Sequence, residues 1–406
     1  MLKKISVDTL QLGMHVHELC GSWMEHPFWR TKFIIDDPED IRRIIESGIR
    51  EVWIDSAKGL DVPGETTVEV TTAIDAALTE VAVRKEPPKS IPMAEELKRA
   101  AQICSTSKAA MVSMFQDVRM GNAVSAEAAG AVVDEISSSV LRNSNALISL
   151  VRLKTVDDYT YMHSVAVCAL MIALARQLNL DEATTRELGM AGLLHDLGKA
   201  FMPPEVLNKP GKLTDEEFAI MKRHPAEGHK ALVECGSLGE IPLDVVLHHH
   251  EKMDGSGYPE RLPGDRISLY AKMGAVCDVY DAITSNRPYK AGWDPAESIR
   301  KMAEWCKGHF DEAIFQAFVK SIGIYPVGSL VRLQSGRLGV VVDQTGKSLL
   351  KPKVKVFFSI KSNLRIPPEI IDLSIPSIRD KIISIEESAQ WNFPDLNHLW
   401  GSVDIW

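Results

Sequence analysis

The sequence predicts a multidomain protein, in which a mainly α-helical central domain lies between a small α+β N-terminal domain and a β-rich C-terminal extension. A chain of 406 residues has the length of two or three domains. A proline-rich stretch interrupts the pattern at 84–92, and apolar residues recur at helical spacing beyond it. After about residue 325, short alternating apolar segments between glycines and prolines replace the helical pattern.

These changes in pattern set the predicted boundaries. They are an N-terminal domain at 1–83, a linker at 84–92, a helical connector at 93–145, a central domain at 146–325 and a C-terminal extension at 326–406. In the N-terminal domain, residues 3–7 and 51–55 alternate like short strands, and Asp37 is expected to begin a helix. The connector helices could pack on the central domain or pair between two chains, so the pattern leaves a homodimer open.

Composition excludes several classes of protein. A net charge of −9 argues against binding of a nucleic acid polymer, although a local cationic pocket could still hold a small phosphodiester. The sequence has no apolar run of about 18 residues, so no membrane span is expected. Its N-terminus lacks a long apolar core, so no signal peptide is expected either. The six cysteines are scattered without paired spacing, which is typical of reduced thiols in the cytoplasm.

Histidines and aspartates are spread over the helix-patterned central segment in a way that suits a metal cluster. The residues are His163, His195, Asp196, His224, His249, His250 and Asp278. A single histidine on a helix is usually a core or surface residue, and only the joint occurrence favours nitrogen and oxygen ligands of a metal. Asp196 stands in a leucine-rich turn, where burial of an unpaired carboxylate would cost several kcal/mol, so it needs a cation or strong donors.

Helical segments are expected to deliver these side chains. Residues 161–178 are apolar nearly all round and predict a buried helix with His163 in its first turn. Asp181 is expected to cap the helix that leads to His195, and Thr214 begins a capping box on the helix expected to deliver His224. Residues 245–250 and 267–284 are expected to be helical and to carry the remaining ligands.

Three motifs carry a family resemblance: HDLGK at 195–199, HHEKMDGSGYP at 249–259, and the segment 278–290. Over about 157–325 the sequence resembles the HD-GYP family of bacterial cyclic-di-GMP phosphodiesterases. The resemblance implies an HD-type helical fold and metal-dependent hydrolysis of the 3′-5′ phosphodiester bonds of cyclic-di-GMP to linear pGpG, and to GMP if cleavage continues. The N-terminal domain resembles the domain of unassigned function that often precedes HD-GYP domains.

The resemblance also implies a site with two divalent metal ions. One ion would be held by His163, His195, Asp196 and Asp278, and the other by Asp196, His224, His249 and His250. Carboxylates without a thiolate favour iron or manganese. Tyr159 stands where some members carry a glutamate that helps hold a third metal, so two ions are expected, and His248 is expected to be a bystander.

Contacts to the substrate follow from the same resemblance. Asp196 and Lys199 are the predicted catalytic residues, and Lys199, Arg287 and Lys290 are predicted to contact the phosphates. Asp281 is grouped with them because it would orient Arg287 or a histidine ligand.

Two surfaces are candidates for protein partners. Gly257, Tyr258 and Pro259, called the GYP loop below, either stabilise their own loop or bind another protein. In the N-terminal domain, the aromatic stretch at 23–30 is either a local hydrophobic cluster or a surface for a ligand or partner, and the cluster is the favoured interpretation.

Two other functions are considered. A non-catalytic receptor for the dinucleotide would not need the ligand set and Lys199. An HD hydrolase of another nucleotide would not need the GYP loop or the Arg287 and Lys290 pattern.

Overall fold

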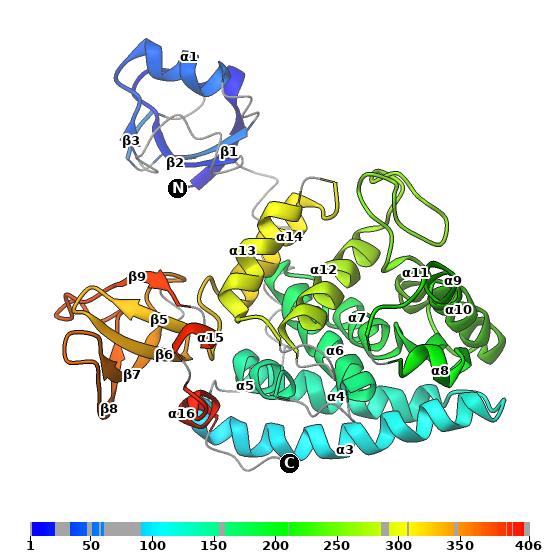
Figure 1. Ribbon diagram of the computed structural model, residues 1–406. Coiled ribbons are helices and arrows are strands. Elements are labelled where there is room, and N and C mark those ends of the chain that lie inside the picture. The colour runs from blue at the N-terminus through cyan, green and yellow to red at the C-terminus, as the bar shows by residue number, and fades with distance from the viewer. Residues whose placement is uncertain are drawn as a thin grey trace. The chain divides into compact units, whose positions relative to one another are not determined.

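The computed structural model of the chain contains two compact units, Met1–Glu86 and Pro87–Trp406, each considered by itself. It describes residues 2–20, 33–46, 51–56, 58–60, 91–153, 159–209, 211–285, 292–306, 308–344, 348–386, 388–391 and 393–401. The aromatic stretch at 23–30 and the predicted phosphate contacts Arg287 and Lys290 lie outside the described residues. The predicted fold class is confirmed: a small α+β unit precedes a mainly helical domain and a five-stranded sheet (Figure 1).

The first unit is a four-stranded antiparallel sheet with one α-helix in its described residues. Its elements are β1 (Leu2–Ser6), η1 (Val7–Thr9), β2 (His15–Cys20), β3 (Phe33–Ile34), α1 (Pro38–Glu46) and β4 (Glu51–Asp55), with strand order β1-β4-β2-β3. The strands predicted at 3–7 and 51–55 are confirmed and pair with each other. Val52 and Ile54 are fully buried because side chains at alternate positions of a strand face the same side.

The second unit begins with three connector helices, α3 (Met93–Arg119), α4 (Ala126–Arg142) and α5 (Ser144–Val151). Met111 and Phe115 of α3 and Ile136 of α4 are buried in one hydrophobic core with Leu193 and Leu194, which precede the predicted ligand His195. The apolar face that could have paired with a second chain is therefore packed on the central domain.

The central domain is built from helices joined by short loops. They are α6 (Tyr159–Gln177), α7 (Glu182–Leu194), η2 (Leu197–Phe201), α8 (Pro204–Leu207), α9 (Asp215–Met221), α10 (His224–Cys235), α11 (Glu240–His248), α12 (Leu269–Thr284), α13 (Pro295–Trp305) and α14 (Glu312–Ile322). Among the described helices, α6 alone is long and apolar enough to cross a membrane, but it is mostly buried and serves as the core helix. It contacts α7, which is followed directly by His195, and α12, which contains Asp278.

The predicted helix caps are confirmed, with one correction near His224. The Asp181 side chain accepts a hydrogen bond from the Thr184 amide at 2.8 Å, and Thr214 and Glu217 form the reciprocal capping box. However, α9 ends at Met221, and His224 is the first residue of α10 rather than a residue of the preceding helix. Proline is tolerated in a first helical turn because its missing N–H would have no helical partner there, and Pro225 therefore fits the start of α10.

The C-terminal extension is an antiparallel sheet with strand order β8-β7-β6-β5-β9. Its elements are β5 (Leu330–Leu333), β6 (Arg337–Asp343), β7 (Lys353–Ser359), β8 (Leu364–Asp372), β9 (Ile382–Ile385), α15 (Ser388–Trp391) and α16 (Leu396–Trp400). The sequence predicted the three inner strands but neither edge strand. Pro367 and Pro368 lie in β8, which tolerates them because an edge strand leaves backbone positions without a ladder partner. The tail packs back on the domain through the buried Trp400.

A buried ion pair between Glu96 and Arg142 connects α3 to α4. Glu96 is fully buried, and its carboxylate accepts hydrogen bonds from Arg142 Nε at 2.8 Å, Arg142 Nη2 at 2.7 Å and Ser139 Oγ at 2.7 Å. These charge-assisted bonds raise the pKa of the Arg142 guanidinium above its ordinary value, although burial alone would lower it. Removal of the guanidinium would leave the carboxylate buried without its main partner.

We therefore expect Arg142→Met to lower the free energy of unfolding by about 3 kcal/mol, measured by urea denaturation. Arg300→Met, which removes an exposed pair with Glu297, is the matched control and should change stability by less than about 0.5 kcal/mol. Equal effects of the two variants would contradict a structural role for the buried pair.

Candidate metal centre

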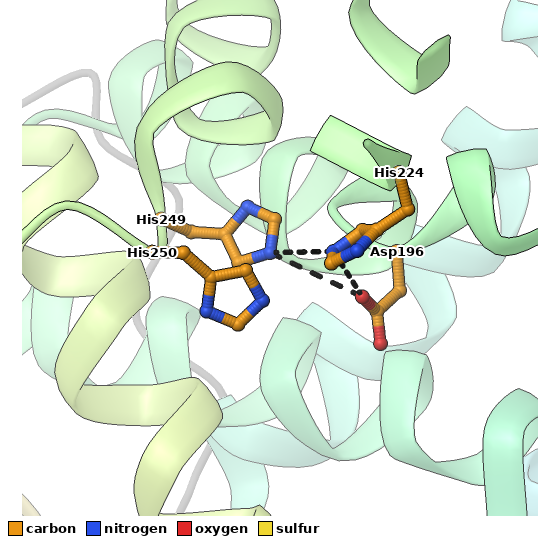
Figure 2. A group of neighbouring side chains, drawn as sticks. All are labelled: Asp196, His224, His249 and His250. Carbon is orange, nitrogen blue, oxygen red and sulfur yellow. Dashed lines mark hydrogen bonds and ion pairs between the residues drawn. The ribbon is translucent and has the colours of Figure 1, made fainter. Parts of the chain in front are cut away.

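The structure brings all seven predicted ligand residues together in the central domain. They come from α6 (His163), the end of α7 (His195), the start of η2 (Asp196), the start of α10 (His224), the turn after α11 (His249 and His250) and α12 (Asp278). Their ligand atoms form two groups, and within each group these atoms lie within 4.8 Å of one another. Figure 2 shows one group, in which three imidazoles and the Asp196 carboxylate surround a common space.

The first group contains His163, His195 and Asp278. His163 Nε2 lies 3.0 Å from Asp278 Oδ1 and 3.2 Å from His195 Nε2. Asp196 Oδ2 lies 3.4 Å from the Nε2 atoms of both histidines. The second oxygen of Asp278 faces the other group, 3.7 Å from His250 Nδ1.

The second group contains Asp196, His224, His249 and His250. Here the other oxygen of Asp196, Oδ1, lies 3.2 Å from His224 Nε2 and 4.0 Å from His249 Nε2 (Figure 2). Because one oxygen of Asp196 faces each group, this carboxylate is placed to bridge two cations.

Backbone carbonyls orient three of the imidazoles. His195 Nδ1 donates to Gly192 O at 2.8 Å and His224 Nδ1 donates to Met221 O at 2.8 Å. His249 Nδ1 lies 3.1 Å from the carbonyl oxygens of Val245 and Val246. Since a carbonyl oxygen only accepts, Nδ1 of each ring carries a proton, and Nε2 is the nitrogen that faces the other ligand residues.

The ionisation of these groups favours binding of a cation. Burial lowers the pKa of His249 well below its ordinary value and lowers that of His250 to about 3, with neighbouring histidines adding to the first shift. Burial alone would raise the pKa of Asp196, but the Lys199 charge and the imidazoles lower it well below the ordinary range. His249 and His250 are therefore neutral and the Asp196 carboxylate is charged, which are the forms that bind metals.

The donor set fits divalent cations. Asp196 Oδ1 is buried and has no hydrogen-bond partner in the described part of the chain. The Nε2 atoms of His224 and His249 lie only 3.4 Å apart, a separation at which two lone pairs repel unless a proton or a cation lies near them. Nitrogen and carboxylate ligands without a thiolate suit transition metals such as iron or manganese.

Lys199 lies beside the bridging carboxylate. Its ammonium group donates to Asp196 Oδ2, and its side chain is 21% exposed, so it is accessible from the outside of the cluster. The sequence suggested that Gly198 ends the tight segment that contains His195 and Asp196, but Gly198 lies inside η2. A Cβ at this position would come 1.9 Å from the carbonyl oxygen of His224, so glycine allows η2 to approach α10 at the ligand itself.

Asp281 orients a histidine ligand. Its Oδ2 lies 2.7 Å from His163 Nδ1, and its Oδ1 accepts from Ser285 Oγ at 3.2 Å. Burial would lower the pKa of His163, but hydrogen bonds with Asp278 and Asp281 raise it above the ordinary value. The contact with His163 supports the prediction that Asp281 orients a histidine ligand. The prediction that Asp281 contacts the substrate stays a prediction.

Glu251 holds the GYP loop, a role that the sequence analysis missed. Its carboxylate is 2% exposed and accepts from the backbone amides of Glu260, Arg261 and Leu262 at 2.7, 2.9 and 3.1 Å. A Cβ on Gly257 would lie 2.5 Å from the Glu251 Cα, so the loop can return over Glu251 only with glycine there. A buried acid directly after the histidine pair and before a glycine-rich turn was the available sequence signal.

Two neighbouring residues lie outside the ligand groups. His248 Nδ1 contacts Asp244 Oδ1 at 2.8 Å, and its Nε2 lies 3.4 Å from Glu260 Oε2, so it faces away from the cluster. The Tyr159 ring stacks on the His163 ring with centroids 5.6 Å apart.

Comparisons with known proteins find two matching family models and several related phosphodiesterases. The domain of unknown function DUF3391 matches residues 2–129, and the HD domain matches residues 140–314. A protein named cyclic di-GMP phosphodiesterase from Pseudomonas aeruginosa is 56% identical over 98% of this chain and 96% of its own length. A cyclic di-GMP phosphodiesterase response regulator from Xanthomonas campestris is 48% identical over 30% of this chain and 32% of its own. A 3′3′-cGAMP-specific phosphodiesterase from Vibrio cholerae is 34% identical over 47% and 42%, respectively.

We expect Asp281→Asn to weaken metal binding by about 10- to 100-fold, because a neutral amide fixes and polarises the His163 ring less well than a carboxylate. Metal affinity would be measured by competition with a fluorescent chelator. Ser285→Ala, which removes only the hydroxyl behind Asp281, is the control and should change affinity by less than about threefold. Unchanged affinity in Asp281→Asn would contradict the orienting role.

Proposed function

The chain belongs to the HD-GYP family of cyclic di-GMP phosphodiesterases, and we propose that it hydrolyses the 3′-5′ phosphodiester bonds of cyclic di-GMP in a metal-dependent reaction. One observation carries the proposal: Asp196 presents one oxygen to each of two histidine groups in a chain that shares 56% of its residues with a cyclic di-GMP phosphodiesterase. The expected products are linear pGpG and, if cleavage continues, GMP.

The proposed ligand sets are those implied by the sequence. His163, His195, Asp196 and Asp278 would hold one divalent ion, and Asp196, His224, His249 and His250 the other, with iron or manganese as the metals that fit the donors. Such ions supply positive charge against the phosphoryl oxygens and acidify water, which hydrolysis of a phosphodiester requires. The protein would contribute buried rings held by hydrogen bonds and, in Asp196, a carboxylate with one oxygen on the side of each group.

Lys199 is the proposed partner of the reacting phosphate. In hydrolysis a water oxygen forms a bond to phosphorus and loses a proton, the bond between phosphorus and the ribose 3′-oxygen breaks, and this leaving oxygen takes up a proton. The Lys199 ammonium group lies at the edge of the cluster beside Asp196, where it can donate to a phosphoryl oxygen or protonate the leaving oxygen. Arg287 and Lys290 remain proposed phosphate contacts on the basis of the family motif alone.

We further propose that the enzyme works in the cytoplasm, where its substrate acts as a second messenger. Cys104, Cys168, Cys235, Cys277 and Cys306 are all free thiols, which supports a reducing compartment. A purely receptor-like role receives no specific support, because a receptor would gain nothing from two complete groups of potential metal ligands.

We expect Asp196→Ala to lower turnover of cyclic di-GMP by about 1,000-fold or more, because both ions lose a shared ligand. Product chromatography would measure the rate, and elemental analysis of the same sample would measure bound metal, which should also fall. Asp265→Ala, at an exposed position, is the matched control. If Asp196→Ala keeps both its metal and its rate, the ligand assignment is wrong.

A further inference from the structure

An aromatic surface extends from the metal-ligand group to the short helix α9. The Tyr258 ring of the GYP loop stacks on the His250 ring, with centroids 4.7 Å apart and planes inclined by 30°. Phe218 of α9 meets Tyr258 edge to face, with centroids 6.4 Å apart. Phe218 is 43% exposed, and α9 contains no buried residue, so packing of a core does not explain this aromatic side chain.

Lys222 places a positive charge over this surface. Its Nζ lies 4.5 Å from the Phe218 ring centroid and 5.8 Å from the Tyr258 centroid. The neighbouring cations Lys209 and Arg223 are paired with Glu217 and Glu227. Within the part of the chain that the structure describes, Lys222 forms no ion pair, so its charge is available to a ligand that enters over the rings.

We propose that Phe218, Lys222 and Tyr258 form the subsite for one guanine base of the substrate, and that Lys222 selects guanine over adenine. This inference rests on the proposed function, which supplies the class of substrate. Every purine can stack on an aromatic ring, so the Phe218 face provides affinity without selection. Guanine presents two acceptors, O6 and N7, on the edge that a lysine reads, whereas adenine presents an amino group in place of O6.

The position of the surface suits a base whose own phosphate reacts. In a nucleotide a single ribose joins the base to the phosphate. When the phosphate reacts at the metal ligands, its base must therefore also lie close to these ligands. Tyr258 contacts the ligand His250 directly, and Glu251 fixes the loop that carries Tyr258. On the other side, Lys209 and the capping box hold α9 through Glu217. The two elements that line the subsite are therefore preorganised by contacts that do not involve the ligand.

The test combines binding and kinetics in the full-length protein. Isothermal titration calorimetry on the metal-depleted protein, which cannot turn the ligands over, would compare the wild type with Lys222→Met and Phe218→Leu for cyclic di-GMP and cyclic di-AMP. Steady-state assays of the metal-loaded protein would compare the same two dinucleotides. We expect Lys222→Met to raise both the dissociation constant and KM for cyclic di-GMP by about 10-fold, with kcat within about twofold, and to reduce the preference for cyclic di-GMP over cyclic di-AMP. Phe218→Leu should weaken both ligands, and Phe218→Trp should restore binding, because stacking needs a ring rather than a particular residue.

Lys230→Met on the exposed side of α10 is the matched control and should bind as the wild type does. Dissociation constants within twofold of the wild type in both Lys222→Met and Phe218→Leu would overturn the subsite. An equal loss for both dinucleotides in Lys222→Met would overturn the selection of guanine. The two proposals fail separately, because a wild-type protein that binds cyclic di-GMP without cleaving it contradicts the proposed hydrolysis while the binding measurements still decide the subsite.

Discussion

The structure depends on an electrostatic constraint: buried carboxylates and lone-pair nitrogens share one small space. Asp196, Asp278 and Asp281 are all buried there, and the Lys199 ammonium group donates to Asp196. Two pairs of Nε2 atoms approach to 3.2 and 3.4 Å. Carboxylates and nitrogen atoms buried this close together repel one another, which destabilises the folded state unless positive charge is present. Bound cations would remove this repulsion, because the same atoms would coordinate them.

The rest of the domain keeps these groups from moving apart. The ligands stand on elements far apart in the sequence, and four of the five rings have an acceptor at Nδ1. His195 and His224 have the carbonyl oxygens of Gly192 and Met221, His249 has those at the end of α11, and His163 has the Asp281 carboxylate. Close backbone approach at Gly198 brings η2 against α10, so the bridging carboxylate and His224 share one rigid junction. The Glu251 carboxylate extends this rigidity to the GYP loop, which connects the ligand group to the aromatic surface on α9.

The sequence predicted the parts of this design that depend on local patterns. Helix periodicity, the Asp181 cap and the Thr214 capping box depend on neighbours within a few residues, and the ligand set follows from short motifs that resemble those of the HD-GYP family. The edge strand β8 was missed because Pro367 and Pro368 interrupt its pattern, and β9 was missed because four residues are too few to show an alternation. The carbonyl acceptors and the contacts of Glu251 leave no periodic signal, since any residue has a carbonyl and the loop amides are reached only after folding.

The most direct test of the account is a crystal of the manganese-loaded protein, analysed by anomalous scattering at the manganese edge. We expect two peaks on either side of Asp196, one among His163, His195 and Asp278 and the other among His224, His249 and His250. A single peak away from Asp196, or no peak within these two groups, would contradict the claim that the buried acids and imidazoles converge in order to bind two cations.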